Sequence, residues 1–176
     1  MARTSASIAV ASPSSSTTVR STFSARSTTR PSSAAVTAVD FSDVALGKGA
    51  RLAESRGVEV DWVVADVLEY EPQREAFDLV LVLYLQLPHD ELLRALRHAG
   101  DAVRSGGTLF VLGHDTTNLV DGYGGPRDAA VLFTPEDVIG ALDGLVVERA
   151  EKVGRTVSLA DGEAVAIDAL VRAVRT

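Results

Sequence analysis

Cysteine is absent from the 176 residues, which excludes disulfides and thiolate metal sites. Three histidines, His89, His98 and His114, are scattered, so we expect no metal centre. No apolar run approaches the roughly 20 residues that a membrane-spanning helix needs, and we expect a cytoplasmic protein. Acidic residues outnumber basic ones by 24 to 17, and the resulting net charge of −7 argues against nucleic acid or an anionic membrane as the main partner.

Acids and glycine are missing from the beginning of the chain. The first acid is Asp40 and the first glycine is Gly47, whereas residues 1–33 are dominated by Ser and Thr. Such a segment has too little apolar surface to offset the entropy that ordering costs. We therefore expect residues 1–35 to form a largely disordered leader, in which Ile8–Ala11 is the only candidate for a short strand. Residues 36–176 suffice for one domain.

The stretch from Val36 to Asp66 organises the rest of the chain. An apolar strand ends in Asp40, and a helix predicted from the N-cap Ser42 runs to a stop at Gly57. A second strand, 58–64, is followed closely by Asp66. Ligands bind at the carboxyl edge of open α/β sheets. Two acids at that edge suggest a nucleotide-like ligand, with one acid for ribose hydroxyls and the other for a base amine.

The remaining pattern alternates strands with helices and ends in two consecutive strands. The predicted elements are a buried strand at 77–83, a helix opening at Asp90-Glu91, a turn at 105–107, a strand at 108–112, a long loop at 116–132, a helix from Thr134 to near Gly144, and strands at 145–153 and 164–174. The link 154–162 is short enough for an antiparallel hairpin. This order predicts an α/β fold, a three-layer Rossmann-like sandwich whose sheet is mostly parallel except for the last hairpin.

From Val36 onward the chain resembles a class I S-adenosylmethionine-dependent methyltransferase of the small stand-alone bacterial type. The likeness rests on the order and spacing of several short motifs, which are Val36–Ser42, Val63–Val67, Phe77–Leu83, Ser105–Leu109 and the closing hairpin. The resemblance implies S-adenosyl-L-methionine as cofactor and a small molecule as methyl acceptor. It leaves open whether the protein is a monomer or a homodimer.

The resemblance also implies roles for individual residues. Asp40 would bind the ribose hydroxyls, and Phe41 would flank the adenine. Asp66 would accept a hydrogen bond from the adenine amine, beside the backbone of Val67. The methionine part would lie against Leu83 and Leu85. The positions implied for the acceptor are Tyr84, Gln86, His114 and Asp115, of which His114 and Asp115 are candidates for helping catalysis.

One family feature is missing, namely the glycine-rich turn that follows the first strand and approaches the methionine moiety. It should lie about 20 residues before Asp40, where this chain has Ser, Thr and Arg. Glycine alone supplies a positive φ freely and lets backbone approach a ligand closely. The segment Arg20–Phe23 is what a one-base shift of codons for Ala-Leu-Asp-Leu, a typical first strand, would give. Three interpretations of the leader therefore remain: a targeting peptide, a flexible tail, or out-of-frame translation, which we favour.

Three functions fit these observations. The first is a methyltransferase that transfers a methyl group in line to a small molecule. The second is an inactive or binding-only remnant of that fold, because the glycine turn is lost. The third is a nicotinamide-dinucleotide-binding protein, because an acid after a second strand also suits a dinucleotide ribose. The final hairpin and the lack of a following substrate domain disfavour the third.

Overall fold

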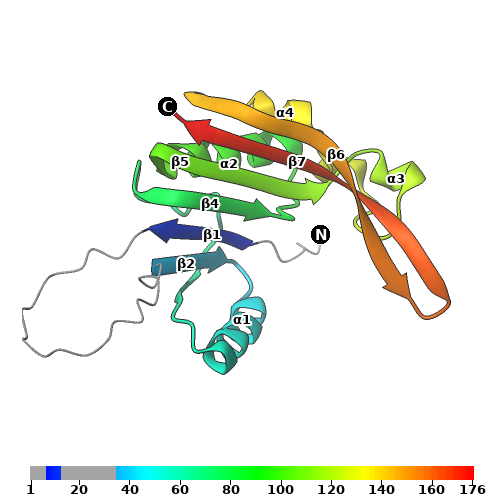
Figure 1. Cartoon of the computed structure of the whole chain (residues 1–176), viewed down its shortest axis with the longest axis horizontal. Coiled ribbons are helices and arrows are strands. Elements are labelled where there is room, and N and C mark those ends of the chain that lie inside the picture. Colours follow the sequence, from blue (N-terminus) through cyan, green and yellow to red (C-terminus); the bar gives the residue numbers. More distant parts are fainter. Residues whose placement is uncertain (1–6, 13–34) are drawn as a thin grey trace, which may run out of the picture.

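The computed structural model describes residues 7–12 and 35–176, which form one seven-stranded sheet with flanking helices (Figure 1). The strands are β1 Ser7–Ser12, β2 Ala35–Asp40, β3 Asp61–Val64, β4 Phe77–Leu83, β5 Val103–His114, β6 Leu145–Leu159 and β7 Gly162–Arg175. The helices are α1 Asp43–Arg56, α2 His89–Ala102, α3 Asn118–Asp121 and α4 Pro135–Ile139, with a 3₁₀ turn η1 at Ala129–Val131. No helix among these residues is long and apolar enough to cross a membrane.

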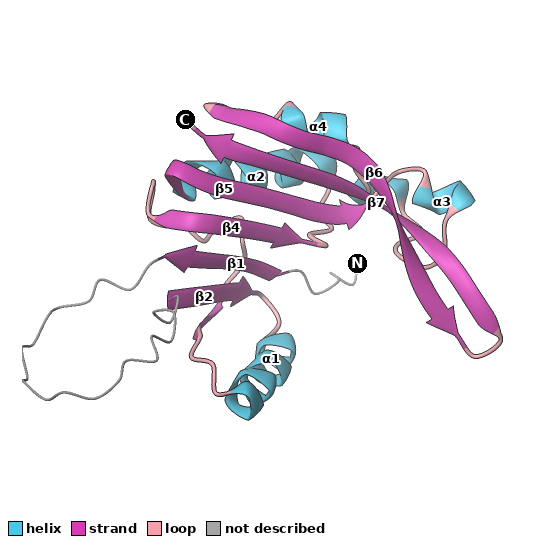
Figure 2. Ribbon diagram, in the orientation of Figure 1, coloured by secondary structure: helices cyan, strands magenta, loops and turns pink. Residues whose placement is uncertain are grey.

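The strand order across the sheet is β3-β2-β1-β4-β5-β7-β6. Strands β2, β3, β4, β5 and β6 share one direction, whereas β1 and β7 run the opposite way. The chain steps outward in opposite directions from β2 to β3 and from β4 to β5. Right-handed crossovers therefore place α1 and α2 on opposite faces, with α2 and α4 behind the sheet in Figure 2. The predicted α/β sandwich with mostly parallel strands is confirmed.

Strand β1 lies inside the sheet between β2 and β4 and runs antiparallel to both neighbours. Ile8 lies opposite Val39 of β2 and also opposite Val82 of β4. The leader thus contributes a strand at the one candidate position, Ile8–Ala11. The disorder expected for the rest of the leader concerns residues 1–6 and 13–34, which lie outside the described residues, and the domain boundary at residue 35 stays a prediction.

Local signals set the ends of the helices as predicted. The side chain of Ser42 accepts a hydrogen bond from the backbone of Ala45 and caps α1, and Gly57 ends that helix in the left-handed conformation at φ 62°. Thr134 and Asp137 form a reciprocal capping box at α4. Helix α4 is shorter than predicted, because it ends at Ile139 and not near Gly144.

Side-chain alternation shows which face of the sheet is covered. Val80, Val82 and Val111 are buried to within 1% and belong to the core beneath α2 and α4. Their neighbours along β4 and β5, such as Leu81 and Phe110, point to the other face and are half-buried. Successive strand residues face opposite sides, so among the described residues the core lies on the α2–α4 side.

Two strands differ from their predicted limits. The turn expected at 105–107 is an irregularity inside β5, where the pairing shifts between Phe77↔Val103 and Leu79↔Thr108. A Cβ on Gly107 would meet backbone oxygens at 2.8 and 2.9 Å, which explains the glycine there. The final hairpin is longer than predicted, because the expected link 154–162 is mostly strand. Figure 1 shows its tip extending well beyond the rest of the sheet.

Candidate functional site

Two predicted acids lie at the carboxyl ends of neighbouring parallel strands. Asp40 ends β2 and pairs with Val64, the last residue of β3, and the backbone N–H of Ala65 donates to the Asp40 carbonyl at 3.1 Å. The Asp40 side chain is fully buried, and its Oδ1 accepts the Ser42 N–H at 2.8 Å. Asp66 follows β3, and its Oδ1 accepts the Leu68 N–H at 3.0 Å. The structure therefore brings both acids to one edge of the sheet.

The apolar residues assigned to the cofactor are divided between surface and core. Phe41 is 39% exposed directly after Asp40, where a ring is available to a ligand. Leu83 is half-buried at the end of β4. Val67 and Leu85, by contrast, are 7% and 3% exposed and belong to the hydrophobic core. The side chains of Val67 and Leu85 therefore stabilise the fold. For Val67, the prediction placed only its backbone beside the adenine.

A buried carboxylate, Asp168 on β7, gathers three side chains from other elements. The hydroxyl of Tyr84 and the Nε–H of Arg155 each donate to Asp168 Oδ2 at 2.9 Å. On the other carboxylate oxygen, Oδ1 lies 3.0 Å from Nδ1 of His114. Neither of these two buried atoms has a hydrogen-bond partner among the described residues, so their contact is an ion-pair distance and not an aligned hydrogen bond. The guanidinium of Arg155 also lies 5.6 Å above the Tyr84 ring.

Asp168 influences the pKa of two of these side chains, Tyr84 and Arg155. Burial and the neighbouring Asp168 carboxylate raise the pKa of the Tyr84 hydroxyl above its ordinary value. The hydrogen bond to Asp168 likewise raises the pKa of Arg155, although burial opposes it. Tyr84 therefore stays a hydrogen-bond donor at neutral pH. Its backbone φ of 51° is strained for a bulky residue, and strain of that kind is concentrated at functional sites.

Asp115 lies next to His114 and forms a separate buried ion pair. Its Oδ1 accepts hydrogen bonds from the Thr117 backbone and hydroxyl at 2.8 and 2.7 Å, and Lys152 Nζ lies 3.0 Å away. Burial acts to raise the pKa of Asp115, but the bonds from Thr117 and Lys152 outweigh it and lower the pKa. Asp115 therefore remains a carboxylate held by Thr117 and Lys152. Gln86, on the loop after Tyr84, is half-buried and is not among the described residues that meet Asp168.

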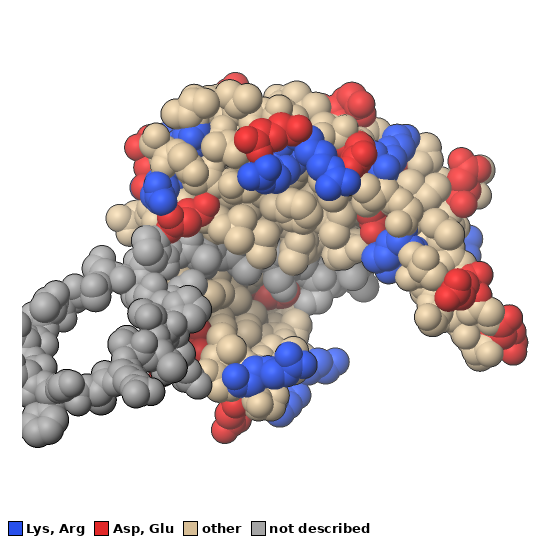
Figure 3. Space-filling model, in the orientation of Figure 1, with Lys and Arg blue, Asp and Glu red and all other residues tan. Residues whose placement is uncertain are grey.

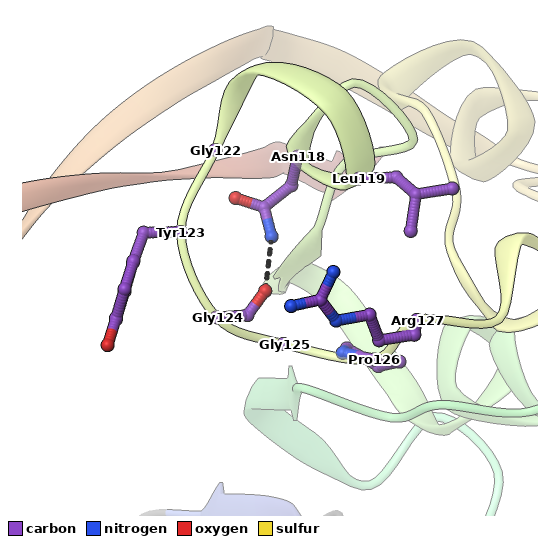
Figure 4. A pocket seen from close by; sticks show the side chains of 8 residues that line it. All are labelled: Asn118, Leu119, Gly122, Tyr123, Gly124, Gly125, Pro126 and Arg127. Atoms are coloured by element: carbon purple, nitrogen blue, oxygen red, sulfur yellow. Dashed lines mark hydrogen bonds between the residues drawn. The ribbon is translucent and has the colours of Figure 1, made fainter.

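The loop after β5 covers the imidazole of His114. A Cβ on Gly125 would approach Cδ2 and Nε2 of His114 to 2.9 Å. Asn118 holds the loop in place, because its Nδ2 donates to the Gly124 carbonyl and its Oδ1 accepts the Ile167 N–H. This loop lines a cavity of about 270 Å³, and Figure 4 shows the side chains that line it. The residues that line it are Asn118, Leu119, Gly122, Tyr123, Gly124, Gly125, Pro126 and Arg127.

Three residues of these clusters were missed in the sequence. Lys152 lies in the predicted strand 145–153, together with the charged residues Glu148, Arg149 and Glu151. The other three form ion pairs at the surface, Arg149 with Glu151 and Glu148 with Arg172, and mixed charges line this part of the molecule in Figure 3. Lys152 instead reaches the buried Asp115, and Arg155, expected in a link, reaches Asp168. Asp168 carried a detectable signal, because it is the single acid within the apolar run 164–171.

The sheet order, the antiparallel β7 and the acids at the carboxyl edge define the S-adenosylmethionine-dependent methyltransferase class of α/β fold. The family model described as a methyltransferase domain matches residues 20–107, half of the chain. The chain therefore belongs to this methyltransferase domain family, for which S-adenosyl-L-methionine is the indicated cofactor. No individual curated protein matches the chain in sequence.

Solved structures share the fold at low sequence identity. An S-adenosylmethionine-dependent methyltransferase from Methanosarcina mazei is 12% identical with a TM-score of 0.58, over 79% of this chain and 81% of that one. The N-methyltransferase NodS from Bradyrhizobium japonicum, in complex with S-adenosyl-L-homocysteine, is 20% identical with a TM-score of 0.58, over 79% and 65%. A protein described by the conversion of a disulfide into a thioacetal group during echinomycin biosynthesis is 19% identical with a TM-score of 0.62, over 80% and 66%. The chain thus spans slightly less than two thirds of the last two proteins.

The chemistry of the described residues suits one half of the indicated cofactor. Asp40 and Asp66 carry carboxylates at the ends of adjacent strands, of which the Asp40 side chain is fully buried, and Phe41, directly after Asp40, is exposed. No group of three or more His, Cys, Asp or Glu in residues 7–12 and 35–176 is arranged to hold a metal ion. The edge of the sheet between Asp40 and Tyr84 is occupied by the reversed strand β1.

Proposed function

We propose that this protein binds S-adenosyl-L-methionine at the carboxyl edge of its sheet and transfers the methyl group in line to a small molecule. The observation that carries the proposal is the convergence of two clusters on one edge. Asp40 and Asp66 lie at the ends of β2 and β3, and the Asp168 cluster lies where β4 and β5 end beside β7. Donor and acceptor would then meet between the two clusters.

The cofactor contacts are proposed residue by residue. Asp40, whose Oδ1 accepts the Ser42 N–H, also accepts from the ribose hydroxyls. Asp66 accepts from the adenine amine, Phe41 packs on the base, and the backbone of Val67 lies beside it. Leu83, and the turn that continues to Leu85, lie toward the methyl end.

The acceptor is proposed to lie against Tyr84, Gln86 and His114. When bound, the cofactor supplies a methyl group on a sulfonium that carries its own activation, so the protein must mainly align the acceptor and exclude water. Nδ1 of His114 lies 3.0 Å from Asp168, and His114 is the residue proposed to take a proton from an acceptor that must lose one. Asp115 is already held by Thr117 and Lys152, which favours a positioning role for it.

A binding-only protein of the same fold is the second candidate, and the reversed β1 specifically favours it. A strand that points away from the edge does not deliver a cofactor-binding turn there. The dinucleotide alternative has no comparable support, because the chain belongs to a methyltransferase domain family.

Calorimetric titration of the full chain with S-adenosyl-L-homocysteine tests the proposal. We expect saturable heat that Asp40→Asn and Asp66→Asn each weaken at least tenfold, a loss of about 1.4 kcal/mol or more in binding free energy. Asp61→Asn, at the opposite end of β3, is the matched control and should bind normally. Absence of saturable heat at ligand concentrations of about 1 mM, which corresponds to a Kd weaker than millimolar, would overturn the proposal.

A further inference from the structure

The direction of β1 decides what the centre of the cofactor edge can offer a ligand. Ser7 pairs with Leu83, so the first residue of β1 lies at the edge where β4 ends. Ser12, the last residue, pairs with Ala35 at the other edge. The six residues of the strand separate Ser7 from Ser12 by about 17 Å. The chain therefore leaves β1 on the side of the sheet away from Asp40 and Asp66.

In a doubly wound sheet, the turn after the central strand presents backbone N–H groups at the carboxyl edge. Here β1 cannot present such a turn, because its carboxyl end is at the opposite edge. The sequence agrees, since glycine first occurs at position 47 and a tight turn that approaches a ligand depends on it. The adenosine anchors on β2 and β3 do not depend on β1 for their position at the edge.

The charged end of the cofactor is a zwitterion, with an ammonium and a carboxylate. On the β4 side of β1, Arg155 and Asp168 are charged, and these pair with each other at 2.9 Å. Tyr84 is likewise engaged, because its hydroxyl donates to Asp168. An amino-acid tail would meet the half-buried, apolar Leu83 at this point. Charged groups are poorly accommodated against apolar surface and stay in water.

We infer that this site recognises the nucleoside and not the amino-acid tail, so that adenosine and 5′-methylthioadenosine are ligands comparable to S-adenosyl-L-homocysteine. The inference rests on the proposed adenosine site formed by Asp40 and Asp66. It names the ligand class as 5′-substituted adenosines. Methyl transfer would then depend on the acceptor-side cluster for alignment, because residues 7–12 and 35–176 give the tail no second anchor.

Calorimetry on the full chain with three ligands tests this inference. We expect Kd values for S-adenosyl-L-homocysteine, 5′-methylthioadenosine and adenosine that agree within about fivefold, or roughly 1 kcal/mol. Inosine, which lacks the amine, should bind the natural chain more weakly than adenosine does. It should bind Asp66→Asn as weakly as it binds the natural chain. Asp61→Asn should reproduce the natural chain with every ligand.

The outcomes separate this inference from the proposed function. A preference of more than fivefold for S-adenosyl-L-homocysteine over adenosine would overturn the inference and leave the proposed function intact. Failure of every ligand to bind would overturn both. The decisive comparison of ligands uses only the natural chain, so it does not depend on whether a variant folds. Circular dichroism verifies that Asp66→Asn and Asp61→Asn fold.

Discussion

Gly125 lies against the imidazole of His114, so closely that a Cβ at position 125 would reach Nε2 and Cδ2 at 2.9 Å. The neighbouring Gly124 has nearly the same backbone conformation, with φ 73° against 77°, but a Cβ there would meet nothing within 4 Å. The two glycines therefore separate the effect of backbone conformation from the effect of contact with His114.

Gly125→Ala should destabilise the protein more than Gly124→Ala. Both variants place alanine in the left-handed region, which costs about 1–2 kcal/mol. Gly125→Ala adds a clash with His114, and overpacking of this kind costs about 1–3 kcal/mol. Urea unfolding measures the difference, and the histidine resonances in NMR spectra should shift only in Gly125→Ala. Equal loss in the two variants would show that the loop does not rest on His114.

Tyr84→Phe should lower the free energy of unfolding by about 1–3 kcal/mol, because it removes a hydrogen bond to the buried Asp168 carboxylate. Tyr123→Phe is the matched control, since Tyr123 is 47% exposed and lies on the neighbouring loop. Thermal and urea unfolding of both variants provide the measurement. A destabilisation by Tyr123→Phe as large as that by Tyr84→Phe would contradict the proposed role of Asp168.

Asp115 should make the free energy of unfolding depend on pH. Its pKa in the folded chain lies below the ordinary value, because the bonds from Thr117 and Lys152 outweigh burial. A lowered pKa means that the unfolded chain binds the proton first, so the stabilisation is present above about pH 4 and is lost as the pH falls through the folded pKa. Thr117→Val should therefore destabilise the protein at pH 7 and much less at pH 3.

Urea unfolding of Thr117→Val and the natural chain at both pH values measures this dependence. At pH 7 the loss should be about 1–3 kcal/mol, because a buried carboxylate loses a hydroxyl donor. The neighbouring Thr116, which is exposed, provides the control variant Thr116→Val. A Thr117→Val deficit that is the same at pH 3 and pH 7 would show that Asp115 is not the group responsible.

Local patterns were sufficient for the elements whose signals are contained in their own residues. Helix α1 begins after Ser42 and ends before Gly57 as predicted, because a cap and a glycine stop act within one turn. Strand β4 matches the apolar run 77–83 residue for residue. The edge acids Asp40 and Asp66 were also predictable, because each directly ends or follows an apolar strand.

The rest depends on contacts between residues far apart in the chain. Asp168 meets Tyr84 across 84 positions, and only the pairing of β7 beside β5 makes them neighbours. The extended hairpin was cut short in prediction because residues 154–162 were assigned to a link, whereas Gly154 pairs with Ile167 inside the ladder. Strand direction is likewise absent from the local pattern, because the apolar run Ile8–Ala11 has the same residue alternation in either direction.

The reversed direction of β1 can be tested by engineered cysteine pairs, because the natural chain has no cysteine to interfere. Ser7 pairs with Leu83 in the antiparallel arrangement, whereas Ser12 lies at the far edge. Directly paired residues of antiparallel strands have Cα atoms about 4.5–5.5 Å apart, within the range of a disulfide.

We expect Ser7→Cys with Leu83→Cys to form a disulfide under mild oxidation, detected by mass spectrometry of the digested chain. Ser12→Cys with Leu83→Cys is the matched control and should stay reduced, since a strand length separates the two positions. The opposite result, with only the Ser12 pair linked, would mean that β1 runs parallel to β4 and delivers its carboxyl end to the cofactor edge.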